Sequence, residues 1–123
     1  AWAHVRDAEP FHGRDGAVWR VHCRPSDAAG IRAGVPDAEA FYDWGGGLAW
    51  IEVSPAPQDA GASVLRAALE PLGGHATLVR ASVETRAVVE VFQPQPTPIA
   101  ALTRGLKQKF DPRGILNPGL MGA

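Results

Sequence analysis

The chain has 123 residues, 46% of them apolar and 20% charged, which suits one domain with its own hydrophobic core. Its 12 lysines and arginines against 13 aspartates and glutamates give a net charge of −1, which argues against a partner such as nucleic acid or an anionic membrane. The single cysteine, Cys23, excludes a disulfide within the chain and fits a reducing compartment.

The chain opens with AWAHVRDAEPF and has no initiator Met. We therefore expect a piece of a longer protein, with N-terminal processing as the alternative. No apolar run approaches the ~20 residues that span a bilayer.

The first half of the chain predicts three strands and one short helix. Residues 17–24 (AVWRVHCR) alternate apolar and polar side chains, which is typical of a strand with one apolar face. Ser26 and Asp27 are suited to cap a short helix that runs to about Ala33. Residues 38–43 and 48–53 are rich in aromatic and β-branched residues, and the turn Trp44-Gly-Gly-Gly47 between them predicts a hairpin.

The second half predicts two helices and one further strand. Apolar residues follow helical spacing from Ala62 to Leu72, with Pro71 near the helix end, and residues 75–81 predict a strand. Residues 82–91 are ambiguous, and residues 92–96 (FQPQP) predict an extended linker. Thr97 and Pro98 are suited to the N-cap and first position of a last helix. One stripe of this helix consists of apolar residues: Ile99, Leu102, Leu106 and Phe110.

The order strand, helix, strand, strand, helix, strand predicts an α+β fold of the ferredoxin-like βαββαβ type. In this fold an antiparallel sheet carries its helices on one face. We divide the chain into a lead-in segment (1–16), a ferredoxin-like cap domain (17–96), and an extra C-terminal helix with an ordered tail (97–123).

The histidine, cysteine and glycine patterns predict no self-contained active site. The histidines match no metal-ligand spacing, and we expect ordinary surface or partly buried side chains at His4, His12, His22 and His75. Cys23 falls on the apolar face of a strand, where an inert thiol is expected. Gly45–Gly47 lies between two strands, so it is neither a P-loop nor a Rossmann turn.

Two segments carry polar groups that a ligand could use. Arg20, His22 and Arg24 share one face of the first strand and could hold an anionic group, although a solvated outer face is the alternative that we favour. The tail FDPRGILNPG is dense in turn-forming residues, and the amide of Asn117 can donate and accept hydrogen bonds at once. That amide suits the edge of a flavin or a nucleobase, and it suits an Asx-turn equally well.

The tail resembles the closing signature of FAD-linked oxidases of the vanillyl-alcohol oxidase type. The stretches VWRVHCRP, FYDWGGGLAWIEV, GGHATLVRA and VFQPQPTPIAALTRGLKQKFDP together resemble the C-terminal domain found in FAD-binding subunits of glycolate oxidase. The resemblance covers essentially the whole chain, and YDWGGG with FQPQP are its most specific parts.

This resemblance implies the C-terminal cap domain of a flavin-dependent 2-hydroxy-acid oxidoreductase, which oxidises glycolate to glyoxylate within a multi-subunit complex. A missing N-terminal domain would hold most of the FAD, so the isolated chain should be inactive and bind flavin weakly or not at all. Asn117 and Gly119 would face the flavin, and Arg6 or Arg20 would lie near the substrate carboxylate. A second flavin subunit and an iron–sulfur subunit would be partners. The expected location is the cytoplasm or the periphery of the inner membrane, where partner subunits would hold the protein.

One departure from the related dehydrogenases bears on the chemistry. They carry a metal-binding histidine pair around a glycine-rich turn, whereas the nearest stretch here, residues 43–50, has no histidine at either end. We expect no metal site, and a partner subunit could then perform the substrate chemistry. The alternatives to the enzyme hypothesis are a non-catalytic docking module of the same complex and a free-standing ferredoxin-like binder of small molecules.

Overall fold

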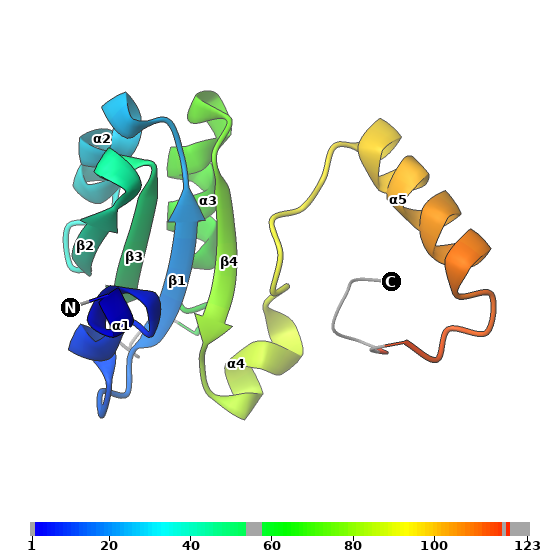
Figure 1. Ribbon diagram of the computed structural model, residues 1–123, viewed down its shortest axis with the longest axis horizontal. Coiled ribbons are helices and arrows are strands. Elements are labelled where there is room, and N and C mark those ends of the chain that lie inside the picture. The colour runs from blue at the N-terminus through cyan, green and yellow to red at the C-terminus, as the bar shows by residue number, and fades with distance from the viewer. Residues whose placement is uncertain (1, 54–57, 117, 119–123) are drawn as a thin grey trace.

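A computed structural model describes residues 2–53, 58–116 and 118 of the chain. Four strands form one sheet in the order β2-β3-β1-β4, and every neighbouring pair is antiparallel (Figure 1). The strands are β1 (Ala17–His22), β2 (Glu39–Asp43), β3 (Leu48–Val53) and β4 (His75–Arg80). With the helices that follow β1 and β3, this order is that of the ferredoxin-like fold, so the predicted α+β fold class is confirmed.

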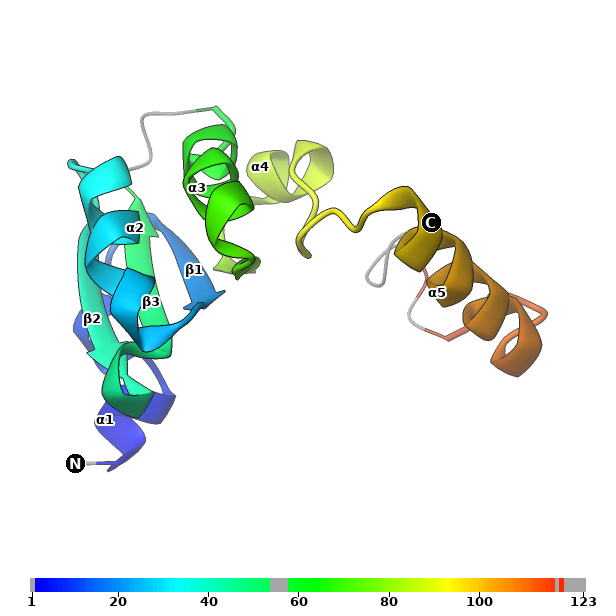
Figure 2. The same cartoon turned by 90° about the horizontal axis from the view of Figure 1, so that it is seen from above.

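The helices fall into three groups around this sheet. Two of them, α2 and α3, cover one face, and α1 lies on the opposite face (Figure 2). The last two, α4 and α5, follow the final strand (Figure 1). The bounds of the helices are α1 Trp2–Arg6, α2 Ala28–Gly34, α3 Ala62–Leu69, α4 Val83–Val88 and α5 Thr97–Phe110.

The main core lies between the sheet and the helices α2 and α3. The apolar side chains of alternate strand positions point into it, as the alternation in residues 17–24 predicted. Its most deeply buried side chains include Trp19, Val21, Ile31, Ile51, Leu65, Leu69 and Leu78. Cys23 is half-buried against this core, and burial raises the pKa of its thiol, as expected of an inert cysteine.

Several helix ends differ from the predictions. The carboxylate of Asp27 does not cap α2, because it accepts hydrogen bonds from Arg24 and Ser26 instead. At α5 the N-cap residue is Pro96 and not Thr97, which already belongs to the first turn. The ambiguous stretch after β4 contains α4, whose first turn is capped by the hydroxyl of Ser82.

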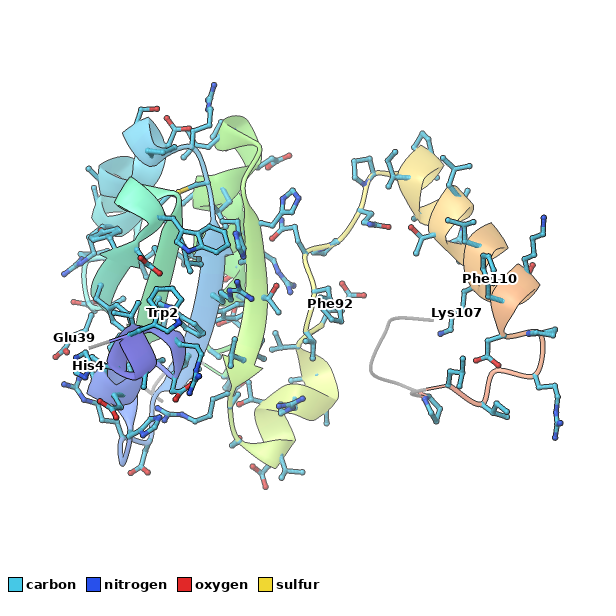
Figure 3. All side chains as sticks on the ribbon, in the orientation of Figure 1. Trp2, His4, Glu39, Phe92, Lys107 and Phe110 are labelled. Atoms are coloured by element: carbon cyan, nitrogen blue, oxygen red, sulfur yellow. The ribbon has the colours of Figure 1, made fainter. Side chains whose placement is uncertain are left out.

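The sheet face opposite the main core is partly covered by the lead-in segment. A 3₁₀ turn, Glu9–Phe11, places Phe11 in a second apolar cluster with Trp50 and Phe41. The helix α1, which carries Trp2 and His4, lies in front of the sheet on this side (Figure 3). This face, the outer face hereafter, is therefore covered at one end and more open at the other.

The helix α5 stands apart from the sheet and buries none of its residues (Figures 1 and 3). Its predicted apolar stripe is formed, but all four side chains are exposed: Ile99 48%, Leu102 66%, Leu106 59% and Phe110 78%. Within the described residues, no helix is both long enough and apolar enough to cross a membrane.

Candidate functional site

The outer face of the sheet arranges its side chains in three rows, each of which crosses all four strands. The strand register places one residue of each strand in every row. The first row consists of Glu39, Glu52, Val18 and Arg80, the second of Phe41, Trp50, Arg20 and Thr77, and the third of Asp43, Leu48, His22 and His75.

The first row holds the lead-in segment to the sheet. Arg14 donates from Nη1 to Glu52 Oε2 at 2.8 Å and to Glu39 Oε2 at 2.6 Å. Glu52 Oε1 lies 3.6 Å from Nη2 of Arg80, whose Nη1 donates to the carbonyl of Phe11 at 2.7 Å. The buried carboxylate of Glu52 is thus shared by two guanidinium groups, so this row is a structural clamp.

The second row contains donors without partners. The indole of Trp50 is 8% exposed and stacks on Phe41, with ring centroids 6.3 Å apart. The guanidinium carbon of Arg20 lies 5.9 Å from the centroid of the Trp50 ring. Both Arg20 Nε and Trp50 Nε1 are buried without a hydrogen-bond partner in the described part of the chain. An orphaned buried donor costs about 1–3 kcal/mol, so such a pair calls for an explanation.

The third row brings two histidines together. His22 of β1 lies directly opposite His75 of β4. The His22 ring also packs edge-on against the Trp44 ring, with the two ring centroids 5.7 Å apart. Burial, followed by the charges of Arg20 and His75, holds the pKa of His22 below its usual range. At neutral pH the His22 ring is therefore neutral, with one nitrogen that donates and one that accepts.

The second and third rows together can bind a small anion. Arg20 provides a fixed charge and a forked donor that matches a carboxylate, and the indole and imidazole groups provide further N–H donors. The flat indole of Trp50 offers an apolar wall beside these donors.

The structure separates the two predicted substrate-binding arginines. Arg6 lies in α1 and is exposed, and it donates from Nε and Nη2 to the carboxylate of Asp7 at 2.6 and 2.7 Å. Arg20 has no such carboxylate partner, and no contact joins the two side chains in the described residues. Arg20 is therefore the better candidate, while the role of Arg6 stays a prediction.

The predicted flavin-facing residues, Asn117 and Gly119, lie outside the described residues. The turn before them is described, and its shape depends on Asp111. The Asp111 carboxylate accepts from the backbone N–H groups of Ile115 and Leu116 at 3.0 and 2.8 Å, and Gly114 takes a positive φ of 62°. The first half of the tail is thus ordered by its own hydrogen bonds.

An open depression of about 350 Å³ lies between α5 and this turn. Its lining includes three cationic side chains, Arg104, Lys107 and Arg113, and the carboxylate of Asp111. None of the described residues that line it has a buried donor without a partner, so the depression is a weaker candidate than the outer face.

The described residues fit only part of a flavin site. The turn Gly45–Gly47 connects β2 to β3, so it offers no helix N-terminus to a pyrophosphate. The outer face instead fits a small anion or the edge of a planar ring, because it combines an aromatic wall with free donors. Among the described residues no three His, Cys, Asp or Glu side chains are placed to hold a metal ion.

The sequence pattern predicted that Arg20, His22 and Arg24 could hold an anion, with a solvated outer face as the favoured alternative, and it did not indicate Trp50 or His75. In the structure Arg24 pairs with Asp27 instead of joining Arg20 and His22. The sequence pattern places Trp50 in an apolar strand and predicts an ordinary histidine at His75. The pairing of β1 with β3 and β4 could have signalled both, but it requires the strand register.

The comparison with curated proteins provides the last finding. "Glycolate oxidase subunit GlcE" of Escherichia coli (strain K12) is 35% identical to this chain over 123 residues. The match covers 99% of the chain and 31% of that protein, so the chain spans about a third of the length of the curated relative. No family model matches the chain, and no solved structure matches it significantly. The chain is therefore a homologue of a glycolate oxidase subunit along its own length, which confirms the resemblance read from the sequence.

Proposed function

We propose that the chain is the cap domain of an FAD-dependent 2-hydroxy-acid oxidoreductase subunit that takes part in the oxidation of glycolate to glyoxylate. Two observations support the proposal. The similarity to a glycolate oxidase subunit covers 99% of the chain, and Arg20 and Trp50 on the outer face each have a buried donor without a hydrogen-bond partner among the described residues. The sequence similarity supports the reaction class, and the donors without partners support the position of the substrate.

In this proposal the residues of the chain bind and orient the acid. Arg20 binds the carboxylate, and Arg6 could assist only if its ion pair with Asp7 opens. Asn117 and Gly119 face the flavin. FAD, when bound, supplies the two-electron oxidation of the alcohol. The chain spans about a third of its relative, and we assign most of the FAD contacts to a domain N-terminal to it.

The proposed organisation follows the same division. Residues 1–16 lead in, residues 17–96 form the cap, and residues 97–123 form the helix and flavin-facing tail. The partners are the N-terminal FAD-binding domain, a second flavin subunit and an iron–sulfur subunit. The proposed location is the cytoplasm, or the inner membrane surface through those subunits.

The exposed stripe of α5 favours a second candidate function, a module that docks onto the rest of the complex. Ile99, Leu102, Leu106 and Phe110 are all exposed in the described structure. A helix with such a stripe is usually packed against another surface. The docking function would need no chemistry from Arg20.

Two substitutions in the full-length protein separate the candidates. If the cap function is right, Asn117→Ala lowers the flavin content of the purified protein, and Arg20→Ala lowers kcat/KM for glycolate by about 10- to 100-fold. Arg24→Ala, which breaks an exposed ion pair with Asp27, is the matched control and should leave both quantities unchanged. Normal flavin content and turnover in both variants, together with weaker subunit assembly, would favour docking.

The 123-residue chain alone should not retain flavin. We expect a colourless protein after purification and no saturable FAD binding at micromolar concentrations, because the described residues provide no phosphate cradle. Absorbance at the flavin bands and a fluorescence titration measure this. Stoichiometric FAD in the chain would contradict the assignment of the cofactor to another domain.

A further inference from the structure

Two donors on the outer face differ from every other buried donor in the described structure. Four buried side-chain nitrogens lack a hydrogen bond: Arg20 Nε, Trp50 Nε1, Arg66 Nε and Arg80 Nε. Arg66 and Arg80 still donate to backbone carbonyls through their other nitrogens. The side chains of Arg20 and Trp50 make no hydrogen bond within the described residues, and they contact each other.

A second tryptophan shows that the fold can satisfy a buried indole. Trp19 precedes Arg20 on β1 but points to the opposite face, where its Nε1 donates to the carbonyl of Ala60 at 2.9 Å. Trp50 is only 8% exposed, yet no described residue provides such an acceptor for its N–H. The two indoles therefore form a natural matched pair, one with a structural hydrogen bond and one without.

The carboxylates nearest to Arg20 already have other partners, so its guanidinium group can bind an anion. In the neighbouring row, Arg14 and Arg80 already share the carboxylate of Glu52. In the other neighbouring row, the carboxylate of Asp43 accepts from the backbone N–H of Trp44 at 2.7 Å. No acidic side chain contacts Arg20 in the described part of the chain, so its charge is uncompensated.

The imidazole rings of His22 and His75 lie in the row next to Arg20. His22 and His75 face each other across β1 and β4, and neither ring makes a hydrogen bond in the described residues. Each ring has at least one N–H, so the two imidazoles add donors next to Arg20 and Trp50. Four neighbouring side chains from β1, β3 and β4 thus provide hydrogen-bond donors and no carboxylate: Arg20, His22, Trp50 and His75.

We propose that Trp50, His22 and His75 complete, with Arg20, a binding site for one small carboxylate. Arg20 forms the charged pair with the carboxylate, the indole N–H of Trp50 donates a further hydrogen bond, and the histidines close the side toward β4. The inference rests on the proposed function in one respect, because the carboxylate would be that of the oxidised acid. Which residues bind the carboxylate can be tested by a binding measurement that involves no oxidation.

Calorimetric titration of the full-length protein with acetate, and with acetamide as the uncharged isostere, measures the site directly. We expect acetate to bind and acetamide to bind at least tenfold more weakly. Trp50→Phe removes the N–H and keeps an aromatic ring, so it should weaken acetate binding roughly tenfold. The smaller ring loses packing in the second apolar cluster, but no hydrogen bond is broken, so the unfolding temperature should fall less than in a variant that loses both. His22→Gln should weaken acetate binding several-fold and provides an independent second variant.

Trp19→Phe is the matched control. It removes the hydrogen bond to Ala60, so it should lower the unfolding temperature and leave acetate affinity unchanged. Equal acetate affinity in the wild type, Trp50→Phe and His22→Gln would overturn the proposal. So would wild-type protein that binds acetate and acetamide alike, or neither.

The experiments distinguish a failure of the carboxylate site from a failure of the proposed function. If acetate binds and is lost in the Trp50 and His22 variants while the wild type does not oxidise glycolate, the site stands and the activity is wrong. If the wild type oxidises glycolate but KM is unchanged in both variants, the activity stands and the assignment of these residues is wrong.

Discussion

Glu52 is the residue on which the outer face depends most for its stability. Its side chain is 8% exposed and contacts Arg14 and Arg80, which come from the lead-in segment and from β4. Glu52→Ala would leave both guanidinium groups without their shared carboxylate, so we expect a loss of about 2–3 kcal/mol in the free energy of unfolding. Urea denaturation measures it. Glu39→Ala, at the exposed end of the same network, is the control and should cost under about 1 kcal/mol. Equal losses would show that burial of Glu52 contributes nothing.

Asp59 should make part of the stability depend on pH. Hydrogen bonds from Ser63, first from its hydroxyl and then from its backbone N–H, lower the pKa of Asp59, and the backbone N–H of Gly61 adds to the effect. A lowered folded-state pKa contributes stability above the unfolded-state pKa, and this contribution is lost as pH falls through the folded-state value.

We therefore expect the unfolding temperature to fall with acidification below about pH 4, the usual carboxyl range, and to fall less in Asp59→Asn. Thermal unfolding from pH 7 to pH 2 measures this. Asp37→Asn, at an exposed position, is the control and should follow the wild-type curve. If Asp59→Asn also follows the wild-type curve, the hydrogen bonds at the start of α3 do not hold this pKa down.

At the scale of residues, the sequence could predict donors but not their partners. The alternation in β1 placed Arg20 and His22 on one face, and the structure confirms that placement. Trp50 and His75 join them only through the register of β3 and β4, which depends on packing between segments far apart in the chain. Arg6 shows the opposite case, because its pairing with the adjacent Asp7 is local and was still overlooked.

At the scale of elements, α5 and α3 differ in what their apolar side chains cover. Leu65 of α3 is fully buried in the main core, whereas Leu106 of α5 is 59% exposed. Leu65→Ala should therefore lower the stability of the 123-residue chain by about 2–5 kcal/mol, and Leu106→Ala by under about 0.5 kcal/mol. Chemical denaturation of both variants measures the difference. A large loss for Leu106→Ala would mean that α5 packs on the core in solution.

The elements with strong periodicity were predicted well, and so was the short helix α2, but the short helices α1 and α4 were not. All four strands and α3 lie within a few residues of their predicted positions, because alternating or helical apolar patterns report burial directly. The six-residue helix α4 buries no side chain, so no apolar pattern could reveal it. Its N-cap, Ser82, was the available signal.

At the scale of the whole molecule, the two faces of the sheet serve different purposes. One face is closed by α2 and α3 over the main core, and the other is closed at the row of Glu52 and more open at the row of His22. The ferredoxin-like strand order follows from the sequence pattern, but the contrast between the ends of the outer face does not. It arises because residues 8–16 fold back over one end, which a linear pattern does not encode.

The proposal that the outer face meets the substrate can be tested by chemical rescue of the assembled enzyme. We predict that Arg20→Ala lowers kcat/KM for glycolate by about 10- to 100-fold with unchanged flavin content, since the carboxylate loses its charged partner. Added guanidinium ion should restore part of that loss in Arg20→Ala and should change nothing in Arg24→Ala. A wild-type kcat/KM in Arg20→Ala, or a loss of the same size in Arg24→Ala, would contradict the assignment of this face to the substrate.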